Sequence, residues 1–171
     1  MSEPPKHHTT ARCSCGGVEL EAIGTPITSV VCYCDDCQEG SFQIESLPNA
    51  RPVLDHDGGT PYVLYRKDHV TCSRGAELLM NHKIRDKSAS SRVVATCCNS
   101  AMYLKFDDGR HWVSMYRAGF QGAVPPLQMR ICTKFKPASG DAPSDVPSYS
   151  GYPIKFMAKL VAAWIPMLLH R

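Results

Sequence analysis

The sequence predicts a mainly β fold in which cysteine groups clip strand ends together, followed by a C-terminal helix. Three observations support this prediction. Short segments that alternate apolar and polar residues recur along the chain, separated by turns rich in Gly, Pro and Asp. Cysteines come in tight groups next to such segments. The stretch from residue 154 to residue 169 is strongly apolar, with its large side chains at roughly helical spacing.

Composition indicates one ordinary globular domain. The chain has 171 residues, of which 43% are hydrophobic and 20% charged, enough to bury a substantial core. The formal net charge is +3, and no basic stripe interleaved with aromatic residues is present. We therefore expect no nucleic-acid partner.

The N-terminal segment and the cysteine count indicate the compartment. Residues 1–10 are polar, with two prolines and two histidines, which predicts a disordered arm and excludes a secretory signal. The nine cysteines are an odd number with close spacings, which favours metal binding over a disulfide framework. Both observations predict a reducing, cytoplasmic location.

The first predicted strands flank the cysteine groups. Residues 18–22 alternate apolar and acidic side chains, and a Gly24-Thr25-Pro26 turn leads into a second strand, residues 27–31. We expect these two strands to form a hairpin, preceded by one cysteine pair and followed by the next group. Residues 47–61 are rich in Pro, Asp and Gly and are predicted to be loop.

The rest of the domain, taken as residues 11–136, continues in short strands. We predict them over residues 62–65, 70–72, 92–96 and 102–106. Asp107-Asp108-Gly109 marks a hairpin turn after the last of these. Residues 137–153 hold four prolines among Ser, Gly and Asp, which predicts a linker.

Residues 154–171 are predicted to form an amphipathic helix, with Pro153 suited to its first turn. A membrane-spanning helix needs about 20 apolar residues, and this segment carries Lys155, Lys159 and Pro166, so we expect no span. An interfacial helix is a weaker alternative. The preferred interpretation is a helix packed on the domain or on a second copy in a homodimer.

The cysteine groups have the spacing of zinc ligands. Cys32, Cys34 and Cys37 form a C-x-C-x-x-C group, and three protein ligands are what a catalytic zinc takes when its fourth position stays open. Cys13 and Cys15 form a separate pair. A structural zinc needs two more ligands, for which Cys97 and Cys98 are the candidates.

Adjacent cysteines on an extended chain point to opposite faces, so a turn is expected at Cys97-Cys98. Asn99 favours it, because Asn adopts the left-handed conformation more readily than most residues. Cys72 and Cys132 lie in strand-like patterns and are interpreted as small buried apolar residues rather than ligands.

These motifs resemble the glutathione-dependent formaldehyde-activating enzyme family, which also includes centromere protein V. The resemblance covers about residues 11–116 and rests on four stretches: Cys13-Ser14-Cys15-Gly16, residues 32–37, residues 73–77 and residues 92–100. It implies a zinc-clipped, Mss4-like β fold. It also implies a structural zinc at Cys13, Cys15 and cysteines near residue 98, and a catalytic zinc at Cys32, Cys34 and Cys37.

The sequence departs from the family pattern at two places. Where the family has C-x-x-C-G after its arginine, an ungapped count from Arg92 places Ala95, Cys98 and Asn99 at the two cysteines and the glycine. Cys97 is a neighbouring replacement for the missing ligand. Tyr33 stands where the family often has His, which leaves the ligands intact and bears on substrate identity.

The resemblance implies a carbon–sulfur lyase that condenses a thiol with an aldehyde, with glutathione and formaldehyde as the family's pair. Asp35 and Asp36 could serve as a base or as acceptors around the metal, although solvated loop carboxylates are the simpler interpretation. The alternative function is a non-catalytic zinc module for protein interaction. Loss of the second metal altogether is a third alternative, which the intact motif disfavours.

Overall fold

The computed structural model describes residues 7–137 and 141–169. Two mainly antiparallel sheets make up most of this part of the protein. The smaller sheet has the strand order β10 (Phe120–Gln121), β1 (His8–Arg12), β2 (Glu19–Ile23), β5 (Val70–Arg74). The larger sheet has the order β11 (Met129–Ile131), β3 (Thr28–Cys32), β4 (Thr60–Arg66), β9 (Trp112–Tyr116), β8 (Ser100–Phe106), β7 (Ser90–Ala95), β6 (Leu79–His82). Among the described strands, β11 and β3 alone pair in parallel.

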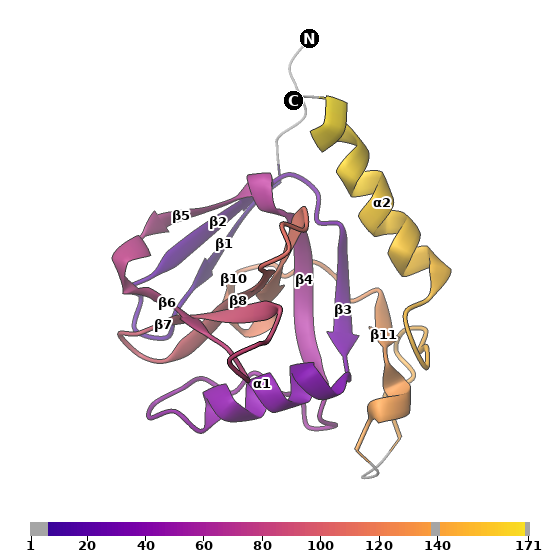
Figure 1. The fold of residues 1–171 in the computed structure, drawn as a ribbon, viewed down its shortest axis with the longest axis horizontal. Helices are drawn as coiled ribbons and strands as arrows, with labels where there is room; N and C mark the ends of the chain where they lie inside the picture. Colours follow the sequence, from indigo (N-terminus) through magenta and orange to yellow (C-terminus); the bar gives the residue numbers. More distant parts are fainter. Residues whose placement is uncertain (1–6, 138–140, 170–171) are drawn as a thin grey trace.

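The helices are few within the described residues. α1 spans Asp35–Glu45 and α2 spans Ile154–Leu169. Short 3-10 turns occur among the strands at Lys67–His69, Ala76–Leu78 and Arg117–Gly119, and after β11 at Thr133–Phe135. The predicted class, mainly β with a C-terminal helix, is confirmed. Figure 1 shows α2 alongside β3 and β11 at one side of the molecule, with α1 along its lower end.

The larger sheet is the middle of three layers. On β4, Tyr62 and Leu64 pack into a core shared with both helices, whereas Val63 and Tyr65 pack into a second core against the smaller sheet. A strand buried on both faces carries a continuous apolar run rather than an alternating one. The run at residues 62–65 therefore belongs to the centre of the fold.

The expected hairpin between residues 18–22 and 27–31 does not form. β2 pairs with β1 and β5 in the smaller sheet, whereas β3 pairs with β4 and β11 in the larger one. Gly24 adopts a φ of +87°, and Ile27 N–H already donates to Leu64 O at 2.7 Å, so the chain changes sheets at the Gly24-Thr25-Pro26 turn. All five residues of β3 are buried, which two-layer burial in the larger sheet explains.

Four further elements differ from the sequence-based expectation. Residues 8–10, expected in a disordered arm, pair in β1, while residues 1–6 lie outside the described part of the chain. Strands β10 and β11 were not predicted, because two or three residues carry no periodic signal. Helix α1 was not predicted either: only Gly40, Ser41 and Ile44 of its eleven residues are buried, so it shows no apolar stripe.

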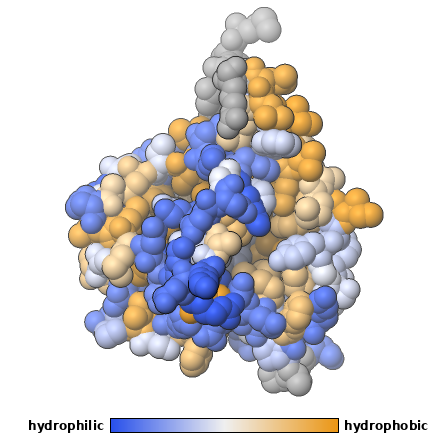
Figure 2. Space-filling view, in the orientation of Figure 1, coloured by the Kyte–Doolittle hydropathy of each residue, from blue (hydrophilic) through white to orange (hydrophobic). Residues whose placement is uncertain are grey.

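Helix α2 packs on the domain through Phe156 and Leu160, as the amphipathic pattern predicts. His111 Nε2 lies 2.7 Å from Leu160 O and adds a polar contact to the helix. Within the described residues, neither helix combines the length and apolar character that crossing a membrane requires. Figure 2 shows the hydrophobic surface that α2 leaves open, made by Ile154, Met157, Val161, Trp164, Ile165, Leu168 and Leu169.

Candidate metal centres

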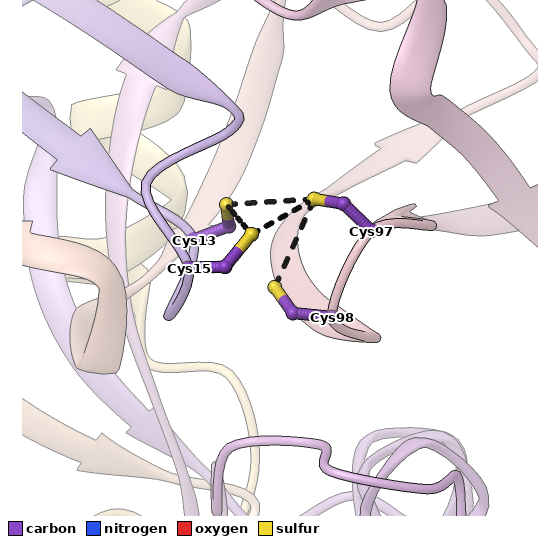
Figure 3. Close-up of side chains that lie close together, drawn as sticks. All are labelled: Cys13, Cys15, Cys97 and Cys98. Carbon is purple, nitrogen blue, oxygen red and sulfur yellow. Dashed lines mark hydrogen bonds between the residues drawn. The ribbon is translucent and has the colours of Figure 1, made fainter.

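Four thiols from two distant segments meet at the first cluster. Cys13 and Cys15 lie on the turn between β1 and β2, and Cys97 and Cys98 lie on the turn between β7 and β8 (Figure 3). The Sγ atoms are 3.6 Å apart for Cys13–Cys15, 3.8 Å for Cys13–Cys97, 3.2 Å for Cys15–Cys97 and 3.9 Å for Cys97–Cys98. A tetrahedral zinc with bonds of about 2.3 Å places its sulfurs roughly 3.8 Å apart. The donor set and its spacing therefore fit a closed Cys₄ site.

A tight turn lets both adjacent cysteines reach this cluster. Cys98 N–H and Asn99 N–H both donate to Ala95 O, at 3.3 and 2.8 Å. Asn99 has a φ of +57°, the left-handed conformation expected for it, and its side chain donates to Pro48 O at 2.9 Å. The turn directs the two Sγ atoms to the same side of the chain, so the predicted Cys97 and Cys98 both belong to the cluster.

Hydrogen bonds in the first cluster favour the thiolate form of its cysteines, which is the form that binds a metal cation. Burial raises the pKa of Cys98, but hydrogen bonds from Ser100 and Ser14 outweigh it and bring that pKa to about 5. Val18 N–H also points at Cys13 Sγ, at 3.1 Å. Donors aimed at sulfur stabilise thiolate, the form that ligates metal.

The second cluster is built where β3 gives way to α1. Cys32 ends the strand, Cys34 is the N-cap residue of the helix, and Cys37 lies in its first turn, with their Sγ atoms all within 4.8 Å of one another. Cys37 N–H and Gln38 N–H both donate to Cys34 O. The C-x-C-x-x-C spacing is thus a strand end plus one helical turn, which brings the three predicted thiols together.

The electrostatics of the second cluster favour negative charge at Cys34. Hydrogen bonds from the Cys32 and Cys37 thiols lower the pKa of Cys34 to about 3, and the charge of Arg92 acts in the same direction. The N-terminus of α1 adds a partial positive charge at this point. A metal cation would meet a thiolate already held in place.

Tyr33, which lies between Cys32 and Cys34 in the sequence, anchors this loop to the protein interior. Its side chain is fully buried, its hydroxyl donates to Asp57 Oδ2 at 2.7 Å, and Arg130 Nη1 donates to the same hydroxyl at 2.7 Å. Arg130 also pairs with Asp145 at 3.1 Å. The residue that departs from the family pattern is therefore a structural anchor, pointing into the protein.

Cys132 and Tyr152 lie beside the second cluster, although the sequence assigns neither to it; Cys132 is buried, as expected, and is not one of the grouped thiols. Cys132, interpreted there as a small buried apolar residue, follows β11, whose register sets Ile131 opposite Cys32. Hydrogen bonding to Cys132, Cys34 and Cys37 raises the pKa of Cys32, and the Tyr152 hydroxyl also contacts the Cys132 thiol. Cys132 has a φ of +59°, an unusual value for a residue other than Gly or Asn. No local pattern in the sequence signals this neighbourhood.

A cavity of about 490 Å³ opens beside the second cluster, between the larger sheet, the start of α1 and α2. Cys32, Cys34 and Cys37 all contribute to its wall. Tyr62 and Arg92 also line it, and Tyr62 Oη and Arg92 Nε are buried and, among the described residues, have no hydrogen-bond partner. Cys72 lies in neither cluster, as expected, and donates to Arg74 O at 3.1 Å.

The two acidic residues of the metal loop, Asp35 and Asp36, lie in different surroundings. Asp36 lines the cavity but pairs with Arg85, with Oδ1 and Nη2 2.7 Å apart. Asp35 is exposed at the helix start. Neither arrangement shows a carboxylate facing the thiols, which agrees with the simpler interpretation of both as solvated.

Fold and sites together define a mainly β protein with two thiol clusters of metal-binding geometry, one closed by four cysteines and one of three beside a cavity. The family model "Glutathione-dependent formaldehyde-activating enzyme" matches residues 8–49. This segment contains Cys13, Cys15, Cys32, Cys34 and Cys37, which are the N-terminal motifs on which the resemblance rests.

Two other comparisons add little. No curated protein matches this sequence. Among solved structures, a Rhodobacter sphaeroides protein is similar with a TM-score of 0.49 and 15% sequence identity, over 82% of this chain and 99% of that one. A likeness of this size carries no argument about function.

Proposed function

We propose that the protein is a zinc-dependent carbon–sulfur lyase that acts on a thiol–aldehyde adduct, of which S-hydroxymethylglutathione is the example suggested by its family. One observation carries the proposal. The three thiols of Cys32, Cys34 and Cys37 form a metal-binding set that borders a cavity large enough for a small molecule.

We assign a structural zinc to the first cluster and a catalytic zinc to the second. Four thiolates close a tetrahedron and leave no position for substrate, whereas three leave one open. When bound at the second cluster, zinc would lower the pKa of a substrate thiol and polarise a carbonyl oxygen. Three thiolates make such a site a net anion, so positive charge from the protein has to support it.

The chain supplies that support. Arg92 lines the cavity and its charge reaches Cys34. The N-terminus of α1 adds to it. In the cleavage direction the carbon–sulfur bond breaks, its electron pair goes to sulfur, and the hydroxyl proton of the adduct passes to water as the carbonyl forms, so the products are a thiolate and an aldehyde.

Tyr152 is our candidate for orienting the substrate hydroxyl. It lines the cavity, and burial together with the neighbouring thiols of Cys32 and Cys34 raises the pKa of its phenol. A phenol that stays protonated can donate a hydrogen bond to the oxygen of the adduct and hold its proton at Oη.

The test combines zinc stoichiometry with catalysis. We expect two zincs per chain in the wild type, one in Cys34→Ser with its fold intact, and two in the control Cys72→Ser. Exchange between thiol, aldehyde and adduct, followed by magnetisation-transfer NMR, should be accelerated by wild type and control but not by Cys34→Ser. Zinc-replete protein that accelerates exchange with no thiol would refute the lyase proposal.

A non-catalytic zinc module is the second candidate, and two observations favour it. Cys132 stands next to Cys32, where a shift could close the second site, and α2 presents an uncovered apolar face. That face suits a protein partner or a second copy of the chain. This candidate predicts four sulfur neighbours at both metals by X-ray absorption, whereas the lyase predicts a mean of fewer than four.

The compartment follows from the same chemistry. All nine cysteines are free thiols in the structure. Thiols in this number persist where the environment is reducing, so we propose a cytoplasmic location.

A further inference from the structure

We infer that the substrate of the second site carries an uncharged apolar or aromatic group, and that glutathione is a poor occupant of this cavity. The inference rests on the proposed lyase function and names the substrate class for the same site. It is argued from the walls of the cavity and from the state of the charges that line it.

The walls beyond the thiols are apolar on both sides. The larger sheet contributes Leu64, Leu104, Phe106 and Trp112, and the side of α2 contributes Phe156, Met157 and Leu160. Phe106 and Trp112 form a tilted aromatic pair with ring centroids 5.4 Å apart. A substituent of the substrate that extends from the thiol cluster toward α2 would lie between these two apolar surfaces.

Among the described residues, three charged side chains line the cavity, and two of them are ion-paired. Asp36 pairs with Arg85 at 2.7 Å. Arg110 pairs with Asp108 at 2.8 Å and stacks on Phe106, with its guanidinium carbon 4.2 Å from the ring centroid. Arg92 donates to two neutral acceptors, Asp36 O and Ser90 Oγ, and its Nε is the one guanidinium nitrogen without a partner among the described residues.

Glutathione places heavier demands on a site than these residues meet. At neutral pH it carries two carboxylates, an ammonium group and two peptide units, which bind through charge-assisted hydrogen bonds. Leaving two carboxylates and an ammonium group against apolar walls carries a desolvation cost, which the single Arg92 guanidinium offsets for one carboxylate at most. The volume of about 490 Å³ does not exclude glutathione. Polarity therefore decides against it, rather than size.

The cavity has few polar groups to offer a ligand. Tyr62, Arg92 and Tyr152 line it, and Tyr62 Oη and Arg92 Nε have no hydrogen-bond partner among the described residues. A hemithioacetal has one hydroxyl beside its sulfur, so a single donor from this set is enough for that oxygen while the substituent lies on the apolar walls.

The test measures binding to zinc-loaded protein with three thiols at one pH. Trp164→Phe leaves Trp112, on the cavity wall, as the single tryptophan, and its fluorescence reports occupancy. 2-Mercaptoethanol gives the reference for a small thiol without a large substituent. We expect benzyl mercaptan to bind at least about ten-fold more tightly than this reference, because its ring is buried, and glutathione no more tightly than the reference.

A pair of variants on α2 locates the effect. Met157→Arg introduces a free cation on the cavity wall and should reduce the preference for benzyl mercaptan over glutathione about ten-fold, as one new charge pair in a partly buried site allows. Val161→Arg places the same charge on an exposed position of α2 that does not line the cavity, and it should leave the preference unchanged.

The outcomes separate this inference from the proposed function. Glutathione binding as tightly as benzyl mercaptan, or equal effects of the two arginine variants, would overturn the inference. If glutathione adduct exchange is then accelerated, the lyase function stands with its family substrate. Preferential binding of benzyl mercaptan without accelerated exchange of any adduct would refute the lyase, and with it the substrate class, and would leave the cavity as a binding site for apolar thiols.

Discussion

Removing the Tyr33 hydroxyl should weaken the fold and the second metal centre together. The hydroxyl donates to Asp57 and accepts from Arg130, both at 2.7 Å, and all three side chains are at most 5% exposed. A hydrogen bond to a charged group contributes about 1.5–3 kcal/mol. In this variant the ion pair between Asp57 and Arg130, at 3.5 Å, and the ion pair between Arg130 and Asp145 both remain, so neither buried charge is left without a partner. We expect Tyr33→Phe to lower the free energy of unfolding by about 2–4 kcal/mol, the range set by two such bonds with partial compensation.

Tyr65→Phe is the matched control. Tyr65 is also buried, but the partner of its hydroxyl among the described residues is the neutral Thr9 Oγ1, at 3.1 Å, so the loss should be about 1 kcal/mol. Urea unfolding of zinc-loaded proteins measures both changes. Because Tyr33 stands between Cys32 and Cys34, a chelator titration should release the second zinc from Tyr33→Phe at lower chelator concentration, and not from Tyr65→Phe. Equal losses in the two variants, or unchanged metal retention in Tyr33→Phe, would refute the anchoring role.

Three further predictions concern pH, packing and metal. Burial raises the pKa of six of the seven tyrosines, namely Tyr33, Tyr62, Tyr65, Tyr103, Tyr116 and Tyr152. In the folded protein these six should remain protonated above the usual value of about 10, so stability should fall as pH rises past that point. Phenolate absorbance of more than one tyrosine at that pH, with intact circular dichroism, would contradict this prediction. Gly40→Ala should destabilise the protein by about 1–3 kcal/mol, because the new Cβ would lie 2.3 Å from Arg92 Nε, and this clash outweighs the better helix propensity of Ala. Thermal unfolding measures the change. A rise in melting temperature would show that Arg92 can move away freely. Cys97→Ser should lose the structural zinc and the cooperative unfolding transition, whereas Cys34→Ser keeps the transition, and a folded Cys97→Ser with one zinc would show that Cys98 suffices on that turn.

The local parts of both metal centres could be predicted from the sequence. Cys32, Cys34 and Cys37 are at most five residues apart, so one strand end and one helical turn are enough to bring them together whatever the rest of the chain does. Cys13 and Cys15 share one turn for the same reason, and Asn99 adopts the left-handed conformation its residue type favours. The strands around residues 62–65 and 102–106, and the C-terminal helix, follow from patterns of apolar residues that any buried segment must show.

What depends on distant contacts could not be predicted in this way. The chain passes from the smaller to the larger sheet at Gly24-Thr25-Pro26, because pairing with β4 and β11 buries both faces of β3, and those partners lie far along the sequence. Cys132 reaches Cys32 through the parallel register of β11 on β3, across a hundred residues of chain. The sequence by itself thus determined the ligand types, their local spacing and the β class. Tertiary structure alone decided which strands pair, what surrounds the second cluster and the apolar character of its cavity, because each of these depends on side chains brought together only by the complete fold.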